Sequence, residues 1–396
     1  MKYLKFTIWT LIIMTVFACN TEEGIAPAQQ NAFIKIIKGR GTDNPLKIEA
    51  LSDGNLLIVS NSTINDPISG TITERVRLVR VDANGELPVS NSERYYPQNQ
   101  SWRASQVLVL PNDNIVIGGT IGNQTVGNTA LFFMTVSSSL DSINSQIYTS
   151  GADNYSLTGL NYDEASSRIL FGGSEQMDDA EDSTFYGELS VDNLTIETFF
   201  KTHKAKALPA TALYKDSNGR LNWVYNSGNS VLVRSNGINM QQIEDAEPLN
   251  FPGSNNIFTK QLLASPEGNI MLFGEHSVNS QIDVFMYQAF SASPIFIGGE
   301  GNDELRGVKK IEDGYLISGS SEISRAGANE QTDFFLSRRG PNGGEVFTKS
   351  FGSNENEVLH DAVMVNDRIF AIGSTVIGIE NTLLLIKTNG FGELED

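Results

Sequence analysis

The chain has 396 residues, and its 47 acidic and 28 basic side chains give a formal net charge of −19 at pH 7. This charge argues against nucleic acid as a partner, because phosphates need a basic face, and against docking of the folded body on anionic lipid. A single cysteine in the whole chain excludes an intrachain disulfide.

Residues 1–18 have the pattern of a lipoprotein signal peptide. Lys2 and Lys5 form a short basic start before an apolar run from Phe6 to Phe17, which is too short to span a bilayer but fits a signal-peptide core. The run ends at Ala18-Cys19, which resembles the lipobox of bacterial lipoproteins, although Phe17 is bulkier than that pattern prefers. The resemblance implies that Cys19 is lipidated and becomes the N-terminus. The alternative is a chance cysteine in a plain signal peptide.

Residues 19–32 are interpreted as a flexible tether. Glu22 and Glu23 resemble the acidic surface-export signal of some outer-membrane lipoproteins. We therefore expect a lipid-anchored protein of the outer membrane, at the cell surface or on the periplasmic face.

The folded part, residues 33–396, is built on a repeat. A strand-like apolar segment recurs seven times and usually ends in a small residue, at positions 60, 119, 173, 226, 274, 319 and 373. A repeat of about 40–50 residues in an all-β context is typical of propeller blades.

Each unit contains signals for four antiparallel strands. Turn residues such as Asp313-Gly314 precede the repeated segment, and a third strand such as 334–338 and a short fourth strand such as 345–349 follow it. The middle strands are apolar almost throughout, as expected for strands packed between neighbouring sheets.

The chain ends are expected to close the propeller. The seventh unit lacks a fourth strand, whereas a spare strand at residues 33–38 precedes the first unit. We expect 33–38 to complete the last blade, which removes two exposed sheet edges and gives a seven-bladed β-propeller. Unit 203–250 is irregular, so six or eight blades remain open.

The repeat resembles that of secreted and lipid-anchored bacterial β-propeller proteins, most of which have no assigned activity. The sixth unit carries the resemblance best, in Gly298-Gly299 with its acidic turn, Asp313-Gly314, and the segment from Tyr315 to Ser320. Units three and four depart from it. The resemblance implies the fold and the location, and leaves the function open.

The loops between units and those between second and third strands should emerge on one face, and the channel mouth there is the expected binding site. Trp102, Arg103, Tyr155 and His203 break the repeat pattern on this face. An aromatic side chain there would stack on a sugar or anchor a peptide. The alternative is that these aromatics fill the gap between adjacent blades.

The sequence is compatible with three functions. The leading one is a binding module for a protein, peptide or glycan on the long-loop face. The second is a glycan hydrolase or lyase with channel-facing carboxylates, for which Asp303, Glu304 and Glu357 are the candidates and a separation of about 5–10 Å is expected. The third is a structural subunit of an envelope complex.

No cofactor or metal is expected. The three histidines, His203, His276 and His360, do not have zinc spacing, and the acidic segment 178–182 lacks the turn glycine of a calcium loop. The acidic and amide pairs that recur between units, such as Asp43-Asn44 and Asn302-Asp303, are interpreted as turn residues.

Overall fold

The repeated apolar segments form strands of antiparallel sheets in the computed structural model of the chain. The structure describes residues 32–65, 70–88, 92–97, 101–123, 128–148, 154–176, 183–202, 210–215, 221–227, 230–236, 243–245, 249–250, 256–265, 269–279, 281–288, 293–299, 301–323, 331–353, 355–378 and 380–394. These residues contain strands and turns and no helix, so the expectation of an all-β fold of antiparallel sheets is confirmed.

Successive strands pair in chain order, in groups of four. The first three groups are β2 (Thr42–Ala50), β3 (Leu56–Asn65), β4 (Ile72–Val81) and β5 (Glu93–Tyr96); β6 (Trp102–Val109), β7 (Ile115–Asn123), β8 (Asn128–Val136) and β9 (Ser142–Tyr148); and β10 (Asn154–Asp163), β11 (Arg168–Gln176), β12 (Ser183–Ser190) and β13 (Ile196–Thr202). A single parallel pair, Asn154 with Thr129, joins the second and third groups into one array of eight strands. Below, each group of four strands is called a sheet.

The later groups repeat this order. They are β14 (Ala210–Lys215), β15 (Leu221–Ser227), β16 (Ser230–Asn236) and β17 (Ile243–Asp245), with β18 (Leu249–Asn250) also on β16; β19 (Asn256–Ala264), β20 (Ile270–Val278), β21 (Gln281–Gln288) and β22 (Ile295–Ile297); and β23 (Asp303–Ile311), β24 (Gly314–Ile323), β25 (Gln331–Arg339) and β26 (Glu345–Phe351).

The last sheet joins the two ends of the folded unit. It contains β27 (Glu357–Val365), β28 (Arg368–Ile377) and β29 (Glu380–Asn389), and β1 (Phe33–Ile37) pairs antiparallel with β29 from Phe33–Lys387 to Ile37–Leu383. This is the strand pairing that the sequence suggested for residues 33–38. Residues 32–396 together form one compact unit.

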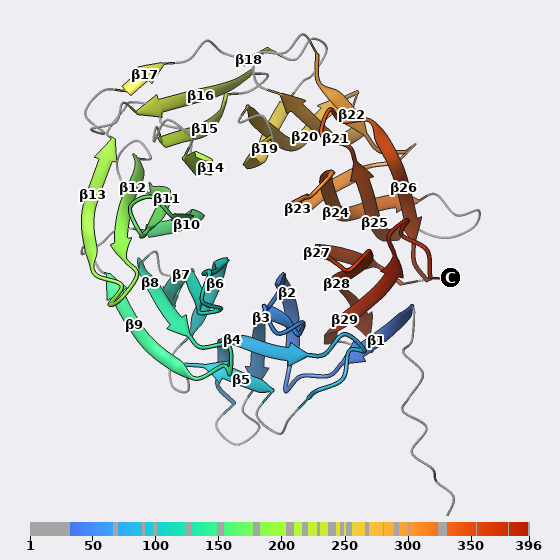
Figure 1. Cartoon of the computed structure of the whole chain (residues 1–396), viewed down its shortest axis with the longest axis horizontal. Helices are drawn as coiled ribbons and strands as arrows, with labels where there is room; N and C mark the ends of the chain where they lie inside the picture. Colours follow the sequence, from blue (N-terminus) through green and yellow to red (C-terminus); the bar gives the residue numbers. More distant parts are fainter. Residues whose placement is uncertain are drawn as a thin grey trace, which may run out of the picture. The chain divides into compact units, whose positions relative to one another are not determined.

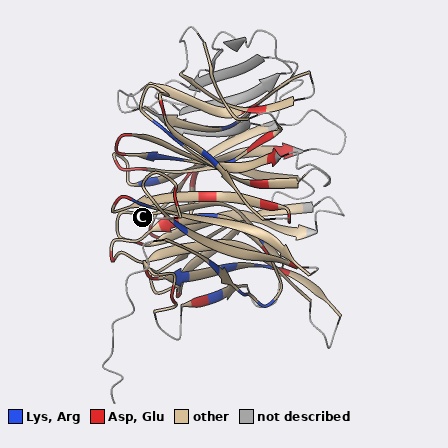
Figure 2. Ribbon diagram, turned by 90° about the vertical axis from the view of Figure 1, so that its right-hand side faces the viewer, with Lys and Arg blue, Asp and Glu red and all other residues tan. Residues whose placement is uncertain are grey.

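The sheets are arranged around a common axis, with the first strand of each group innermost (Figure 1). Each of these innermost strands contacts the next one along the chain, from β2 through β6, β10, β14, β19 and β23 to β27, and β27 contacts β2. Figure 2 shows the strands from the side, with uncharged residues making up most of each strand.

Apolar clusters fill the spaces between neighbouring sheets. One of them joins the first sheet to the last, because Ile48 and Val79 lie with Phe33, Phe370 and Leu385 in a single buried cluster. Similar clusters lie between four other pairs of successive sheets, namely the first and second, second and third, fifth and sixth, and sixth and seventh. Burial of apolar area between sheets, rather than inside one central core, therefore stabilises this fold.

Polar side chains add specific links between sheets. The Asn61 amide donates to the Ala104 carbonyl oxygen at 2.8 Å and accepts from the Ala104 N–H at 2.8 Å. Gln261 makes the same pair of bonds with Val308, and the Thr129 hydroxyl with Tyr155. Each link satisfies backbone groups of an innermost strand that a neighbouring sheet would otherwise leave without a partner.

Every innermost strand carries a β-bulge at the same place. The pairing with the second strand skips one residue in each of the seven, namely Leu46, Ser105, Thr158, Thr211, Lys260, Arg306 and His360. We call these the bulge residues. A bulge re-aims side chains and increases the local twist, so one residue of each inner strand is presented differently from its neighbours.

The bulge explains why the repeated segment ends in a small residue. Gly274 and Gly319 pair with Thr259 and Leu305, the residues just before the bulge. A Cβ atom on either glycine would overlap a backbone carbonyl oxygen of the inner strand, that of Phe258 or of Glu304. At these two bulges the glycine is therefore a steric requirement, which could not be read from the sequence alone.

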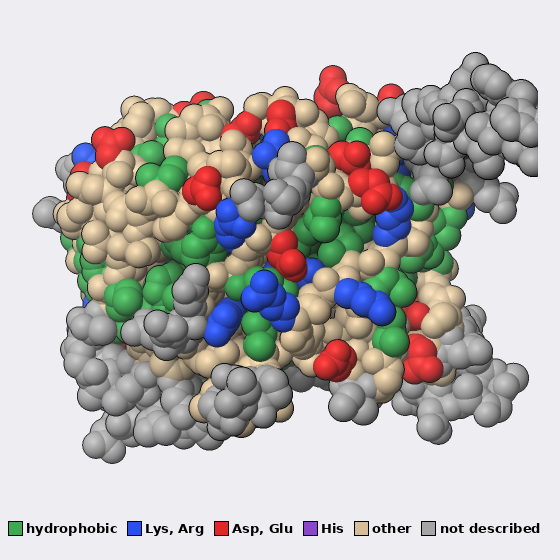
Figure 3. Space-filling view, turned by 90° about the horizontal axis from the view of Figure 1, so that it is seen from below, with side chains coloured by type: hydrophobic (Ala, Val, Ile, Leu, Met, Phe, Trp, Pro, Cys, Tyr) green, Lys and Arg blue, Asp and Glu red, His purple; other side chains and the backbone are tan. Residues whose placement is uncertain are grey.

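The outermost strands expose some apolar side chains, such as Ile34 and Ile36 on β1 and Ile143 and Ile147 on β9. Figure 3 views the molecule from below relative to Figure 1, and on that face Lys, Arg, Asp and Glu side chains lie between the hydrophobic ones. The part of the chain that the structure describes contains no apolar helix of membrane-spanning length.

Candidate functional site

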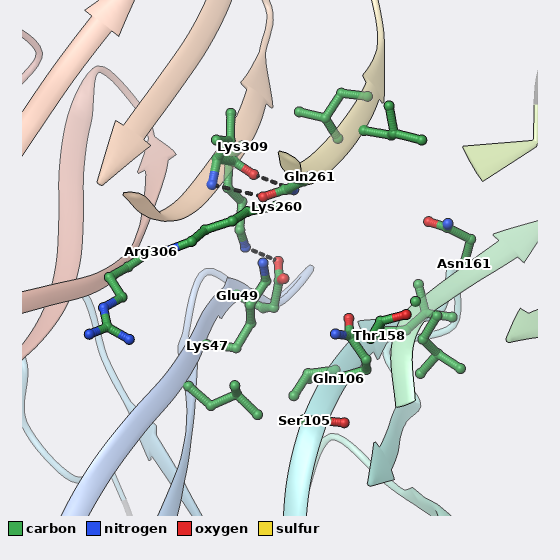
Figure 4. Close-up of a pocket in the computed structure, with 18 of the residues that line it drawn as sticks. Lys47, Glu49, Ser105, Gln106, Thr158, Asn161, Lys260, Gln261, Arg306 and Lys309 are labelled. Carbon is green, nitrogen blue, oxygen red and sulfur yellow. Dashed lines mark hydrogen bonds and ion pairs between the residues drawn. The ribbon is translucent and has the colours of Figure 1, made fainter. Parts of the chain in front are cut away.

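A cavity of about 340 Å³ lies among the innermost strands. Its lining comes from β2, β6, β10, β19 and β23, so five sheets contribute to it (Figure 4). A volume of this size falls at the lower end of the range for small-ligand sites. This cavity is therefore the candidate site.

The β-bulges supply much of its lining. Of the six bulge residues whose side chains the structure describes, five line the cavity: Leu46, Ser105, Thr158, Lys260 and Arg306. The same backbone irregularity thus presents a different side chain from each sheet. A constant scaffold with a variable residue at one position is suited to building a site from a repeat.

One side of the cavity is rich in cations. Lys47, Lys260, Arg306, Lys309 and Lys310 line it, whereas Glu49 is the one carboxylate among the lining residues that the structure describes. Figure 4 shows the charged side chains on β2, β19 and β23, across from Ser105, Gln106, Thr158 and Asn161 on β6 and β10. The cavity therefore has a charged side and a neutral polar side.

Lys309 is the most constrained of these cations. Its ammonium lies 2.6 Å from a Glu49 oxygen and 3.5 Å from Asp361, and it donates to the Ile48 carbonyl oxygen at 2.6 Å. Burial alone would lower the pKa of Lys309, but the Asp361 and Glu49 carboxylates outweigh burial and raise it. Asp361 also accepts the Ile48 N–H at 3.0 Å, so this group links β2, β23 and β27.

Lys260 and Arg306 are adjacent, on neighbouring sheets. Glu304 lies between them, 3.7 Å from the Lys260 ammonium and 2.8 Å from the Arg306 guanidinium. Lys260 also lies 2.6 Å from Glu275 and donates to the Leu305 carbonyl oxygen. The Lys260 and Arg306 side chains are 36% and 40% exposed, so both can be reached from the solvent.

The aromatic candidates from the sequence lie in the core. Trp102 is 5% exposed and packs on Phe132 with ring centroids 4.4 Å apart, in the cluster between the first two groups of strands. Tyr155 is 7% exposed and packs edge-on against Phe185. Both fill gaps between sheets, as the alternative interpretation of the sequence had it.

Arg103 is half-exposed on β6 and lies 3.7 Å from Glu74, outside the cavity lining. His203 lies outside the described residues, as do the acidic segment 178–182 and Cys19.

The three carboxylates proposed for catalysis do not converge on one site. Asp303 is fully buried and accepts the Gly299 N–H at 2.7 Å, and burial raises its pKa. Glu357 is buried as well and accepts the Ser353 N–H at 3.0 Å. Each holds the loop that enters its own sheet, which is the turn role suggested for the recurring acidic residues. Of the three, Glu304 is the one beside the cavity cations.

Asp43 occupies the equivalent position in the first sheet, where it lies 2.5 Å from Arg77. Burial raises the pKa of Asp43 despite the opposing charge of Arg77. A Cβ atom on Gly39, Gly298 or Gly352 would overlap the carboxylate of Asp43, Asp303 or Glu357, respectively. Glycine and acid together thus form the recurring turn between sheets.

His360 is the bulge residue of β27 and lies 3.2 Å from the Ser374 hydroxyl. Burial and the nearby Arg306 charge lower its pKa to about 4, so the imidazole is neutral at pH 7. His276 is buried against Phe296, and burial lowers its pKa too. In the described part of the chain, no cluster of three or more His, Cys, Asp or Glu could hold a metal ion.

Comparison with known proteins identifies the fold and no family. No family model matches the chain, and no curated protein matches it. Among solved structures, an ulvan lyase is similar over 91% of this chain and 96% of its own, with a TM-score of 0.53 and 8% identity. Pyrococcus horikoshii acylaminoacyl peptidase is similar over 90% of this chain, with a TM-score of 0.51 and 10% identity.

The chain spans about half the length of that peptidase, 53%. A Trypanosoma rangeli sialidase matches with a TM-score of 0.41 and 12% identity. At these identities the likeness shows an all-β, propeller-like fold and nothing of the chemistry.

Proposed function

We propose that this chain is a lipid-anchored protein of the cell envelope, folded as a seven-bladed β-propeller, that binds a ligand in its central cavity without transforming it. The observation that carries the proposal is the cavity itself, lined by a different bulge residue from each of five sheets. Seven bulges, one per repeat, support the blade number.

Closure of the ring is supported at two places. β1 pairs with β29, and the apolar cluster around Phe33 and Ile48 joins the first sheet to the last. A closed propeller leaves only short, protected strand edges, and its axis is a natural place for a small cavity.

The carboxylates favour binding over hydrolysis. Asp303 and Glu357 are buried in turn hydrogen bonds, and Glu304 is engaged by Lys260 and Arg306. A glycoside hydrolase needs two carboxyl groups that face one substrate, and these three do not form such a pair. The alternative of a glycan hydrolase or lyase rests on the fold likeness to the ulvan lyase.

One experiment separates the two. The purified full-length chain is mixed with a panel of envelope and extracellular glycans, and its thermal midpoint and the release of new sugar ends are measured in the same samples. We expect at least one glycan to raise the midpoint with no new ends. New reducing or unsaturated ends would establish an enzyme instead, and an unchanged midpoint across the panel would reject glycan binding.

The anchor has its own test. Replacing the lipidated residue, Cys19→Ser, is expected to move the protein from the membrane fraction to the soluble fraction, because one acyl-modified residue supplies the whole attachment. The measurement is fractionation followed by detection of the chain. Unchanged membrane partition of the variant would reject lipidation at Cys19.

A further inference from the structure

The side chains that line the cavity are mostly cationic among their charged members, whereas the chain as a whole is anionic. The chain as a whole is at −19, yet five cations line the cavity beside a single carboxylate. With the carboxylates that contact these cations from outside the lining, Glu275, Glu304 and Asp361, the described groups are five cations and four carboxylates. A locally cationic site in an anionic protein attracts an anion.

The bulge residues divide the cavity into two kinds of wall. The neighbouring innermost strands β19 and β23 present Lys260 and Arg306, whereas β2, β6 and β10 present Leu46, Ser105 and Thr158. Gln106 and Asn161 extend the uncharged side (Figure 4). A ligand that fits both walls carries an anionic group at one end and several neutral hydrogen-bonding groups at the other.

Glu304 indicates how the anion is held. Its carboxylate contacts both Lys260 and Arg306, so a carboxylate can be bound by these two side chains together. The Arg306 guanidinium donates a charge-assisted hydrogen bond to Glu304 at 2.8 Å, and the Lys260 ammonium adds an ion pair at 3.7 Å. A ligand carboxylate that joins or replaces Glu304 would use the same donors.

We infer that the cavity binds an acidic saccharide, with its carboxylate on Lys260 and Arg306 and its hydroxyls toward Ser105, Gln106, Thr158 and Asn161. This rests on the proposed function and names its ligand class. A sugar acid carries a carboxylate and many hydroxyl groups in one molecule. A cavity of about 340 Å³ accommodates one or two sugar rings.

The test uses oligogalacturonates of two to four rings and their methyl esters as matched probes, with the full-length chain and titration calorimetry. The acid is expected to bind at low salt, more weakly as salt rises, and the ester at least about tenfold more weakly than the acid. Two further titrations use sodium sulfate and galacturonate monomer. Sulfate tests for a general anion site, and the monomer tests whether a free sugar acid binds as well as the end of an oligosaccharide.

The test variant carries both Lys260→Met and Arg306→Gln, and it should bind the acid at least about tenfold more weakly. Lys349→Met with Arg94→Gln makes the same charge change on outer strands and should leave the affinity within twofold. Lys260→Arg with Arg306→Lys keeps both charges and should restore most of the binding, which distinguishes a ligand contact from a loss of folding.

The outcomes separate the two proposals. Equal binding of acid and ester would overturn the acidic class and leave a glycan-binding module. Binding of sulfate as tight as that of the dimer would overturn the saccharide class. No binding of any oligogalacturonate, with another glycan raising the thermal midpoint, would overturn this inference alone.

Discussion

At the residue scale, a glycine lies opposite five of the seven bulges, and substitution can measure its role. In Gly319→Ala the new Cβ would overlap the Glu304 carbonyl oxygen, so the inner strand must shift. We expect a loss of about 1–3 kcal/mol of stability, the usual cost of overpacking, seen as a lower thermal midpoint. Gly299→Ala is the matched control, because a Cβ there meets nothing within 4 Å. Equal midpoints for both variants would contradict the steric explanation.

A second prediction at this scale concerns pH. The folded pKa of His360 is about 4 against an ordinary value of 6.5, so on acidification the unfolded chain takes up a proton before the folded one does. Stability from this residue is therefore present above about pH 6.5 and is lost as the pH falls toward 4.

His360→Gln removes that proton uptake and keeps a polar side chain near Ser374. We expect its stability to fall less steeply than that of the unaltered protein between pH 6.5 and 4, measured by thermal midpoints across that range. Parallel curves for the two proteins would show that His360 is not shielded in the folded state.

The candidate site was only partly visible in the sequence. Trp102 and Tyr155 break the repeat, but a pattern break does not distinguish a core aromatic from an exposed one, and both side chains are buried. Lys260 and Arg306 were missed because a single extra residue in a strand leaves no mark in composition. Their common position, 14 and 13 residues before Gly274 and Gly319, is the signal that an alignment of the repeats could have used.

At the element scale, the links between sheets make a direct prediction. Asn61 bonds both the N–H and the carbonyl oxygen of Ala104 on the next inner strand, and it is buried. In Asn61→Ala these two backbone groups lose their partner, so we expect a loss of about 2–4 kcal/mol, measured by thermal or denaturant unfolding.

Asn342→Ala, at an exposed turn position, serves as the control for that measurement and should change stability by less than about 0.5 kcal/mol. A loss for Asn61→Ala no larger than this control would mean that water or a neighbouring group replaces the amide.

The strands themselves were well predicted, for a physical reason. Turn residues such as Asp313-Gly314 and apolar segments such as Tyr315 to Ile317 mark hairpins locally, and β24 begins and continues there. The parallel pair between Asn154 and Thr129, which merges two groups of strands, depends on how adjacent sheets approach each other. No local signal encodes that approach.

At the scale of the whole molecule, the proposed ligand site depends on the proposed closure of the ring. Its lining comes from sheets that are far apart in the chain, since β2 and β23 both contribute. Lys309 and Asp361 link those sheets to β27 by their contacts with Glu49 and Ile48. An open ring would separate these walls, and the ligand proposals would fail with it.

Cross-linking β1 to β29 is the measurement that tests closure most directly. In a Cys19→Ser background, cysteines are placed at register partners, in one chain at Ile36 and Leu384 and in another at Lys35 and Leu385. The control carries cysteines at Ile36 and Leu385, which are one residue out of register and therefore on opposite faces of the sheet. Mass spectrometry after mild oxidation should find an intramolecular disulfide in at least one matched chain and little in the control. Free thiols or links between molecules in both matched chains would contradict a propeller closed by its N-terminal strand.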